Sequence, residues 1–359
     1  MKDRVRFSSK RLFLTLMLCA CAVILLQNYS LGRGGGFILD VIAVFSGLAL
    51  SFVFFIPSII LKKKTDADLL MLARQRTPRA AVAVSIFYAA YFAYTATFFL
   101  IPYTDMFSKK YYPEVSRCVI ALLLIAACVY AATKGANVIT RFGIFLFAFA
   151  MLTNLLMFGG SLTALDFSNG FRIGDADSLF GDVVYFCAPS FTAVIFACLA
   201  GQGRGFTVKQ PVIALLLSGL KYSLVLFFIR YALGSYADRQ EYRTFVLSRV
   251  AHFGAYAGVE SFYLALATMS VFMTVSLFFC CVCRSAGMSG SLRVIVPEAV
   301  FVFLLNLLTK YNQTAEALLT NKYILLFLTF IAAVVIPVLY LFVWRKFNAE
   351  KNKHIITEP

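Results

Sequence analysis

The residues best placed to bind a small solute surround a proline in an otherwise apolar stretch. Residues 182–200 contain Pro189, followed by Ser190 and Thr192. Proline removes one backbone donor, and a broken helix inside a membrane exposes carbonyls and amides that can hold a solute. We therefore predict a ligand site at Pro189, Ser190 and Thr192. The competing interpretation is a proline kink whose hydroxyls bond back to their own helix.

A second set of polar side chains forms a stripe. Tyr88, Tyr91 and Tyr94 recur every third residue within the apolar segment 79–102, which places them on one face of a helix. The stripe could line a polar cavity, with Tyr91 and Tyr94 as ligand-binding candidates. The alternative is helix packing, with each hydroxyl bonded across to a neighbouring helix.

Charged residues within or near the apolar segments form a third set. A charge in lipid is costly unless it is paired or hydrated, so each is a functional candidate. Lys221 and Glu298 lie at similar depth and are candidates for an ion or proton pathway, whereas Glu260, near the outer face, is a ligand-binding candidate. The alternatives are a Lys221 chain that extends to the membrane surface and a helix start at the interface for Glu298. Asp40 and Asp182 are expected to be hydrated at the outer interface.

The elements that must position these residues are about ten apolar segments. The chain has 359 residues, of which 61% are apolar and 14% charged. A helix of about 20 apolar residues crosses a bilayer core, and no gap between the segments can hold a soluble domain. We predict an all-α polytopic membrane protein with a single permease-like domain, residues 1–359. The predicted helices are 11–31, 36–61, 79–102, 117–133, 141–160, 182–200, 211–233, 258–283, 292–308 and 322–344.

Lysine and arginine gather in alternate gaps between these segments, with a bias of about two to one toward one side. This bias predicts that both termini lie inside, which requires an even number of helices. Ten helices permit a five-plus-five inverted repeat, the architecture of many secondary transporters. The basic start and the apolar run from Leu12 to Leu26 resemble a signal peptide. Because the apolar stretch continues past Cys21, we predict an uncleaved first helix.

Several function classes do not fit the chain. The net charge of +16 is distributed over short loops, so we predict no nucleic-acid partner. Nine cysteines fall almost entirely in apolar segments, and neither His252 nor His354 lies near the Cys280–Cys283 group, so we predict no metal site. No nucleophile–base pair, phosphate-binding loop or dinucleotide motif is present. We therefore expect no enzyme activity and no cofactor.

Three stretches together resemble the spore-germination permeases, the B subunits of nutrient germinant receptors. The first is Tyr112-Pro113 with the passage 130–142, which contains Lys134-Gly135 and Arg141. The second is Tyr242–Arg249, and the third is Gly258–Leu277, which contains Glu260 and Ser276. The length, ten spans and short tails are similar to that family too.

This resemblance implies the inverted-repeat fold of the amino acid–polyamine–organocation superfamily and a place in the inner membrane of endospores. It also implies that the protein works together with a germinant receptor A subunit and a lipoprotein C subunit. The chain would then sense small nutrients, often amino acids, and trigger ion release and germination. The alternatives are a stand-alone amino acid or cation transporter of the same superfamily and a non-transporting membrane scaffold.

The chain departs from the family pattern in two places that would form the binding site. Residues 19–29 contain no glycine where family-like transporters break their first helix. Ala193 and Val194 continue the sixth helix where the family has an acidic element. Either the ligand differs from that of the relatives or ligand binding has been lost.

Overall fold

The computed structural model describes residues 7–26, 37–65, 69–170, 179–253, 256–288 and 290–343. Within this part of the chain, ten spans are long and apolar enough to cross a membrane, which confirms the prediction of an all-α polytopic membrane protein. The predicted ends at 31, 36 and 344 lie outside the described residues. The spans are Ser9–Leu26, Phe37–Lys64, Pro78–Lys110, Arg117–Lys134, Ala136–Ala164, Leu179–Leu199, Lys209–Arg239, Glu260–Ser285, Leu292–Tyr311 and Lys322–Val343.

Most spans are built on one long helix. These helices are α1 (Ser9–Leu26), α2 (Phe37–Thr65), α4 (Pro78–Lys110), α5 (Arg117–Lys134), α6 (Ala136–Ser161), α9 (Lys209–Phe228), α11 (Glu260–Ser285) and α12 (Leu292–Tyr311). Span six is divided into α7 (Leu179–Phe186), a 3-10 turn (Ala188–Ser190) and α8 (Phe191–Leu199). Span seven continues α9 through a π-helical segment (Ile229–Leu233) and a 3-10 segment (Gly234–Arg239). Span ten joins α14 (Lys322–Phe330), a π-helical segment (Ile331–Val335) and residues 336–343.

Short elements connect the spans. They are the helices α3 (Leu69–Arg76), α10 (Arg243–Val250) and α13 (Gln313–Leu319), the 3-10 turns Leu162–Ala164, Phe167–Gly170 and Ala200–Gln202, and two small sheets. The strands β1 (Phe7–Ser8) and β2 (Gly203–Arg204) pair in parallel, and β3 (His252–Phe253) pairs antiparallel with β4 (Tyr256–Ala257). The β1–β2 pair brings the start of span one to the place where span six ends and span seven begins.

Six of the helix contacts are those that the predicted five-plus-five inverted repeat requires. If the first five spans correspond in order to the last five, α4 matches α11, α5 matches α12, α1 matches α7–α8, and α2 matches α9. Under this correspondence, a contact between α5 and α11 predicts a second contact between α12 and α4. In the same way, a contact between α1 and α9 predicts one between α7 and α2. All four contacts are present, and α4 against α11 and α2 against α9 map onto themselves.

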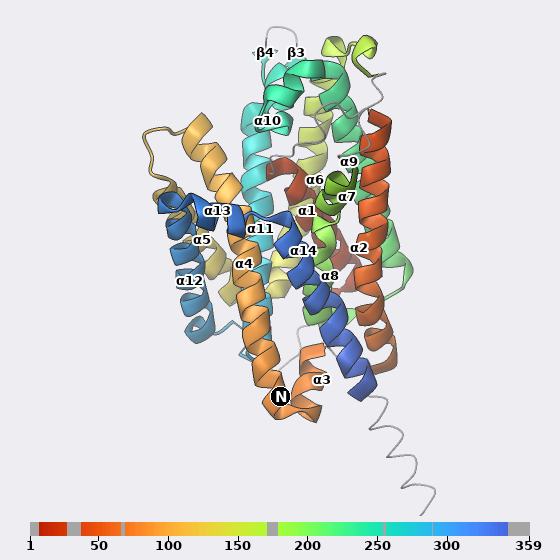
Figure 1. The fold of residues 1–359 in the computed structure, drawn as a ribbon, viewed down its shortest axis with the longest axis vertical. Coiled ribbons are helices and arrows are strands. Elements are labelled where there is room, and N and C mark those ends of the chain that lie inside the picture. The colour runs from red at the N-terminus through yellow and green to blue at the C-terminus, as the bar shows by residue number, and fades with distance from the viewer. Residues whose placement is uncertain are drawn as a thin grey trace, which may run out of the picture.

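The spans form one bundle in which α3 and the end of span ten lie at the end opposite β3 and β4 (Figure 1). Spans one, six and eight form its centre, since 78%, 94% and 83% of their most apolar stretches are buried. The corresponding share is only 28% for spans four and five, which therefore present most of their surface outward. The break in span six consequently lies in the best-packed part of the protein.

Helix α4 runs past its predicted end at 102. Pro78 stands at its first turn, where the fixed φ of proline suits a helix start. The helix then continues through Pro102 to Lys110, because Asp105 anchors the last turns. The Lys109 Nζ lies 2.7 Å from one Asp105 oxygen, and an Arg117 Nη lies 2.8 Å from the other.

Candidate functional site

The break in span six is where the sequence predicts it. α7 ends at Phe186, and α8 begins at Phe191 after a buried turn that contains Pro189. The Ser190 amide donates to the Cys187 carbonyl at 2.9 Å, the short bond of a 3-10 turn. The α-helical hydrogen bonding therefore gives way to a 3-10 turn within the span, at the centre of the bundle, while the backbone stays right-handed helical.

The two hydroxyls beside the proline behave differently. Thr192 Oγ1 donates to the Pro189 carbonyl at 2.7 Å, as the proline-kink interpretation expects. Ser190 Oγ is buried beside the Cys187 thiol, a weak hydrogen-bonding group, and has no partner of ordinary hydrogen-bond geometry within the described part of the chain. A buried hydroxyl without a strong partner costs stability, so Ser190 is the better candidate for contact with a solute.

Helix α2 lies directly against this break. Ser51 Oγ donates to the Gly47 carbonyl at 3.0 Å and lies 3.3 Å from the Cys187 carbonyl. Gly47 allows the close approach, because a Cβ there would lie 2.7 Å from the Phe186 backbone carbon. The turn at Pro189 and α2 are therefore in direct contact.

Backbone carbonyls in the last turns of α1 accept hydrogen bonds from side-chain hydroxyls on four other elements. Each backbone carbonyl has two lone pairs, so it can accept a side-chain hydroxyl in addition to a helix hydrogen bond. The pairs are Tyr222 to Ala20, Tyr185 to Val23 (3.2 Å), Thr244 to Ile24 (3.1 Å) and Tyr263 to Leu25. Residues 27–36, which hold the glycine run after this helix, lie outside the described residues.

The tyrosine stripe packs α4 against α13 and span ten. Tyr91 OH lies 3.0 Å from Thr329 Oγ1, and Tyr94 OH donates to the Leu318 carbonyl at 3.0 Å. Since Thr329 itself donates to the Leu325 carbonyl, Tyr91 is the donor in its pair. This is the arrangement that the packing interpretation expects, and a ligand role for Tyr91 and Tyr94 stays a prediction.

Tyr88 completes the π-helical segment of span ten. Its hydroxyl donates to the Ala332 carbonyl at 2.8 Å. In the π pattern this carbonyl would accept the amide of residue 337, but Pro337 has no N–H, and the Ile336 amide bonds to Ile331. The tyrosine therefore supplies the donor that the proline lacks.

The charged candidates lie apart from one another. Lys221 is half-buried on α9, and Glu298 is only 8% exposed on α12, with no partner for its Oε1 within the described residues. No ion pair joins them in that part of the chain. Glu260 instead pairs with Arg249, with an Nε–Oε2 distance of 3.1 Å and both side chains well exposed. Pathway roles for Lys221 and Glu298 and a ligand role for Glu260 stay predictions.

Sequence reasoning missed a buried charge network at the outer end of the bundle. Asp40 is 1% exposed and Asp182 is 6% exposed, so the expectation that both are hydrated was wrong. Asp40 is covered because Arg230 reaches it from span seven, with an Nε–Oδ2 distance of 2.9 Å. A signal was available: opposite charges in two apolar spans predict a pair, since neither is stable in lipid alone.

The network extends from this pair to two further segments. Asp238 Oδ1 lies 3.3 Å from Arg230 Nη1 and 3.4 Å from an Arg243 Nη. Asp238 is 28% exposed, so it carries the network toward the surface. Arg230 stands in the π-helical segment of span seven, and π-bulges occur often at functional sites. The network ties α2, span seven and α10 together.

A family model described as spore germination protein matches residues 13–314, which include spans two to nine in full and most of span one. The chain belongs to the spore germination protein family. The resemblance seen in the sequence is thereby confirmed. No curated protein matches the chain. Family membership and the ten spans together make it a multi-pass, permease-like membrane protein related to germination.

Proposed function

We propose that this protein is the permease-like integral subunit of a spore nutrient germinant receptor, which senses small nutrients and triggers germination. The observation that carries the proposal is the break in span six of a chain from this family. The break leaves the Ser190 hydroxyl without a strong partner among the described residues and lies against α1 at the centre of the bundle. Amino acids are the favoured nutrients, because their ammonium and carboxylate groups can bond to carbonyls and to hydroxyl or amide donors.

The proposal includes a place and partners. We infer that the protein lies in the inner membrane of the spore and works with the receptor A and C subunits. Binding of a nutrient and movement of helices are sufficient for this role, so it requires no catalysis and no cofactor. Movement at Pro189 would reach α2 through Ser51, and through α2 the outer charge network at Asp40.

Ligand-dependent thermal unfolding of the purified protein, across a panel of amino acids and sugars, tests the binding step. We expect at least one amino acid to raise the Tm of the wild type, and Ser190→Ala to remove that increase without lowering the Tm of the free protein. Ser46→Ala, an exposed serine on α2, serves as the matched control and should respond as the wild type does. The proposal fails if no compound raises the Tm and if spores with Ser190→Ala germinate normally.

A stand-alone transporter is the second candidate, because the inverted repeat is a transporter architecture. It predicts uptake of an amino acid or a cation by vesicles that contain only this chain. Deletion of the gene in a spore former would then leave germination intact. A non-transporting scaffold is the third candidate, supported by the continuous helix from Ser9 to Leu26. It predicts that germination depends on the protein while no compound changes its Tm.

A further inference from the structure

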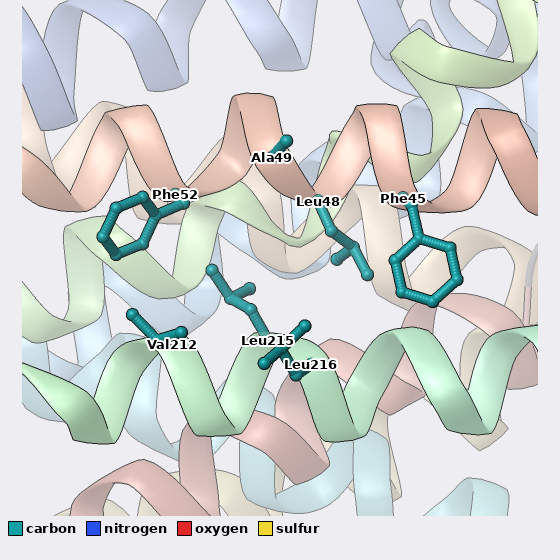
Figure 2. A pocket seen from close by; sticks show the side chains of 7 residues that line it. All are labelled: Phe45, Leu48, Ala49, Phe52, Val212, Leu215 and Leu216. Carbon is teal, nitrogen blue, oxygen red and sulfur yellow. The ribbon is translucent and has the colours of Figure 1, made fainter.

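An apolar groove lies between α2 and α9 on the outside of the bundle (Figure 2). Its volume is about 280 Å³, and its lining residues are Phe45, Leu48, Ala49, Phe52, Val212, Leu215 and Leu216. Phe45 is 43% exposed and Leu216 is 55% exposed, so the groove opens away from the core. In a membrane this opening faces lipid.

The groove follows from the sizes of the residues where the two helices meet. A Cβ at Gly219 would lie 2.7 Å from Leu48 Cδ1, so this glycine lets Leu48 lie against α9. The neighbouring Ala49 carries only a methyl group and leaves the adjacent space empty. Figure 2 shows Phe52 and Val212 at one end of that space and Phe45 at the other.

The dimensions of the groove fit a hydrocarbon chain. The groove follows α2 from Phe45 to Phe52, which is about 10 Å at the rise of an α-helix. The surface beside the groove is apolar too, with Ile56 and Leu220 exposed. The occupant is therefore a single apolar chain that enters from the bilayer.

Two lysines continue the groove toward the end of the bundle that holds the start of α9. Lys209 lies about two helical turns before Leu216 on α9, and Lys63 lies about five turns after Phe45 on α2, so each shares the helical phase of a residue that lines the groove. Both side chains are exposed, and neither has an ion-pair partner within the described part of the chain. An apolar groove that leads to unpaired positive charges matches an acyl chain attached to an anionic headgroup.

We propose that the α2–α9 groove binds one acyl chain of an anionic phospholipid. The headgroup phosphate lies beside Lys209, and the positive charge of Lys63 attracts it from further along α2. Lysines near an anionic membrane surface attract such headgroups, and burial of the chain adds apolar contact. The inference is independent of the proposed nutrient site, since it concerns the opposite side of α2.

Native mass spectrometry of the protein, released from vesicles with equal amounts of phosphatidylglycerol and phosphatidylcholine, tests the proposal. We expect the wild type to retain phosphatidylglycerol in preference to phosphatidylcholine. Ala49→Trp, which fills the groove from an exposed position, should lower the retention of both lipids. If Ala49→Trp folds poorly, Leu216→Trp fills the same groove from α9 and replaces it in the test. Leu50→Trp, on an exposed position outside the groove, is the matched control and should retain lipid as the wild type does.

Charge variants separate the headgroup from the chain. Lys209→Gln and Lys63→Gln should each lower the preference for phosphatidylglycerol about five-fold, whereas Lys110→Gln, an exposed lysine at the other end of the bundle, should not change it. Equal retention in the wild type and both groove-filling variants would overturn the proposal. So would a preference for phosphatidylglycerol that is insensitive to Lys209 and Lys63.

Discussion

Arg230 donates through Nε to Asp40 Oδ2 at 2.9 Å, with the two side chains 8% and 1% exposed. The pair joins span two to span seven, which correspond to each other in the predicted inverted repeat. Asp238 and Arg243 extend it to α10. The bond therefore fastens the two halves at the outer end, while the apolar contact between α2 and α9 continues toward the other end.

Removal of Asp40 should strongly destabilise the protein. Asp40→Leu leaves the buried Arg230 guanidinium without its closest anion, and we expect the free energy of unfolding to fall by about 3–5 kcal/mol. Thermal unfolding in detergent measures this change. The double variant Asp40→Leu/Arg230→Met should recover part of the loss, because an apolar pair needs no counter-charge.

A matched control for the buried pair is the exposed pair of Arg249 and Glu260. Arg249→Gln should change the free energy of unfolding by less than about 1 kcal/mol, since water screens that interaction. Equal effects of Asp40→Leu and Arg249→Gln would mean that the Asp40–Arg230 pair is not buried in the folded protein.

Two of the tyrosines in the stripe should differ in their effect on stability. Tyr88→Phe leaves the Ala332 carbonyl buried without a donor, and we expect a loss of about 1–3 kcal/mol in the free energy of unfolding. Tyr91→Phe should cost about 1 kcal/mol or less, because Thr329 keeps its bond to the Leu325 carbonyl. Chemical or thermal unfolding of the two variants provides the comparison, and the reverse order would contradict this account of the π-helical segment.

Two glycine-to-alanine changes should affect the Tm differently. Alanine normally stabilises a helix relative to glycine, by up to about 1 kcal/mol. Gly47→Ala should nevertheless lower the Tm, because its Cβ would lie 2.7 Å from the Phe186 backbone and the Val183 carbonyl oxygen. Gly181→Ala should leave the Tm unchanged or raise it, since its Cβ meets nothing closer than 3.4 Å. A neutral Gly47→Ala would show that α2 does not press against the break in span six.

Glu298→Gln tests the ion or proton pathway without loss of the fold. Because Glu298 Oε1 has no partner within the described residues, a neutral amide should leave the Tm unchanged or raise it. If Glu298 relays ions, the variant should reduce proton or cation flux across vesicles that contain the protein. Glu114→Gln, an exposed carboxylate between α4 and α5, is the control. Unchanged flux in Glu298→Gln would remove this residue from the pathway.

The sequence by itself determined the spans, the position of the helix break and the family. Spans are readable locally because a backbone in lipid must bond to itself, so each crossing requires a long apolar helix. The interruption at Pro189 is local for the same reason, since a proline lacks the donor that its own helix needs. The match over residues 13–314 rests on residue types alone.

Only the tertiary structure decided which side chains meet. Asp40 and Arg230 are far apart in the chain, and their contact depends on how α2 packs against span seven, which no local pattern encodes. The Tyr88 bond to Ala332 likewise depends on the seam between α4 and span ten. Asp40 looked hydrated because it stands near the end of an apolar segment, but depth along a helix does not show which face a neighbour covers. The partner helix sets that burial, and with it the charge network and the lipid-facing groove.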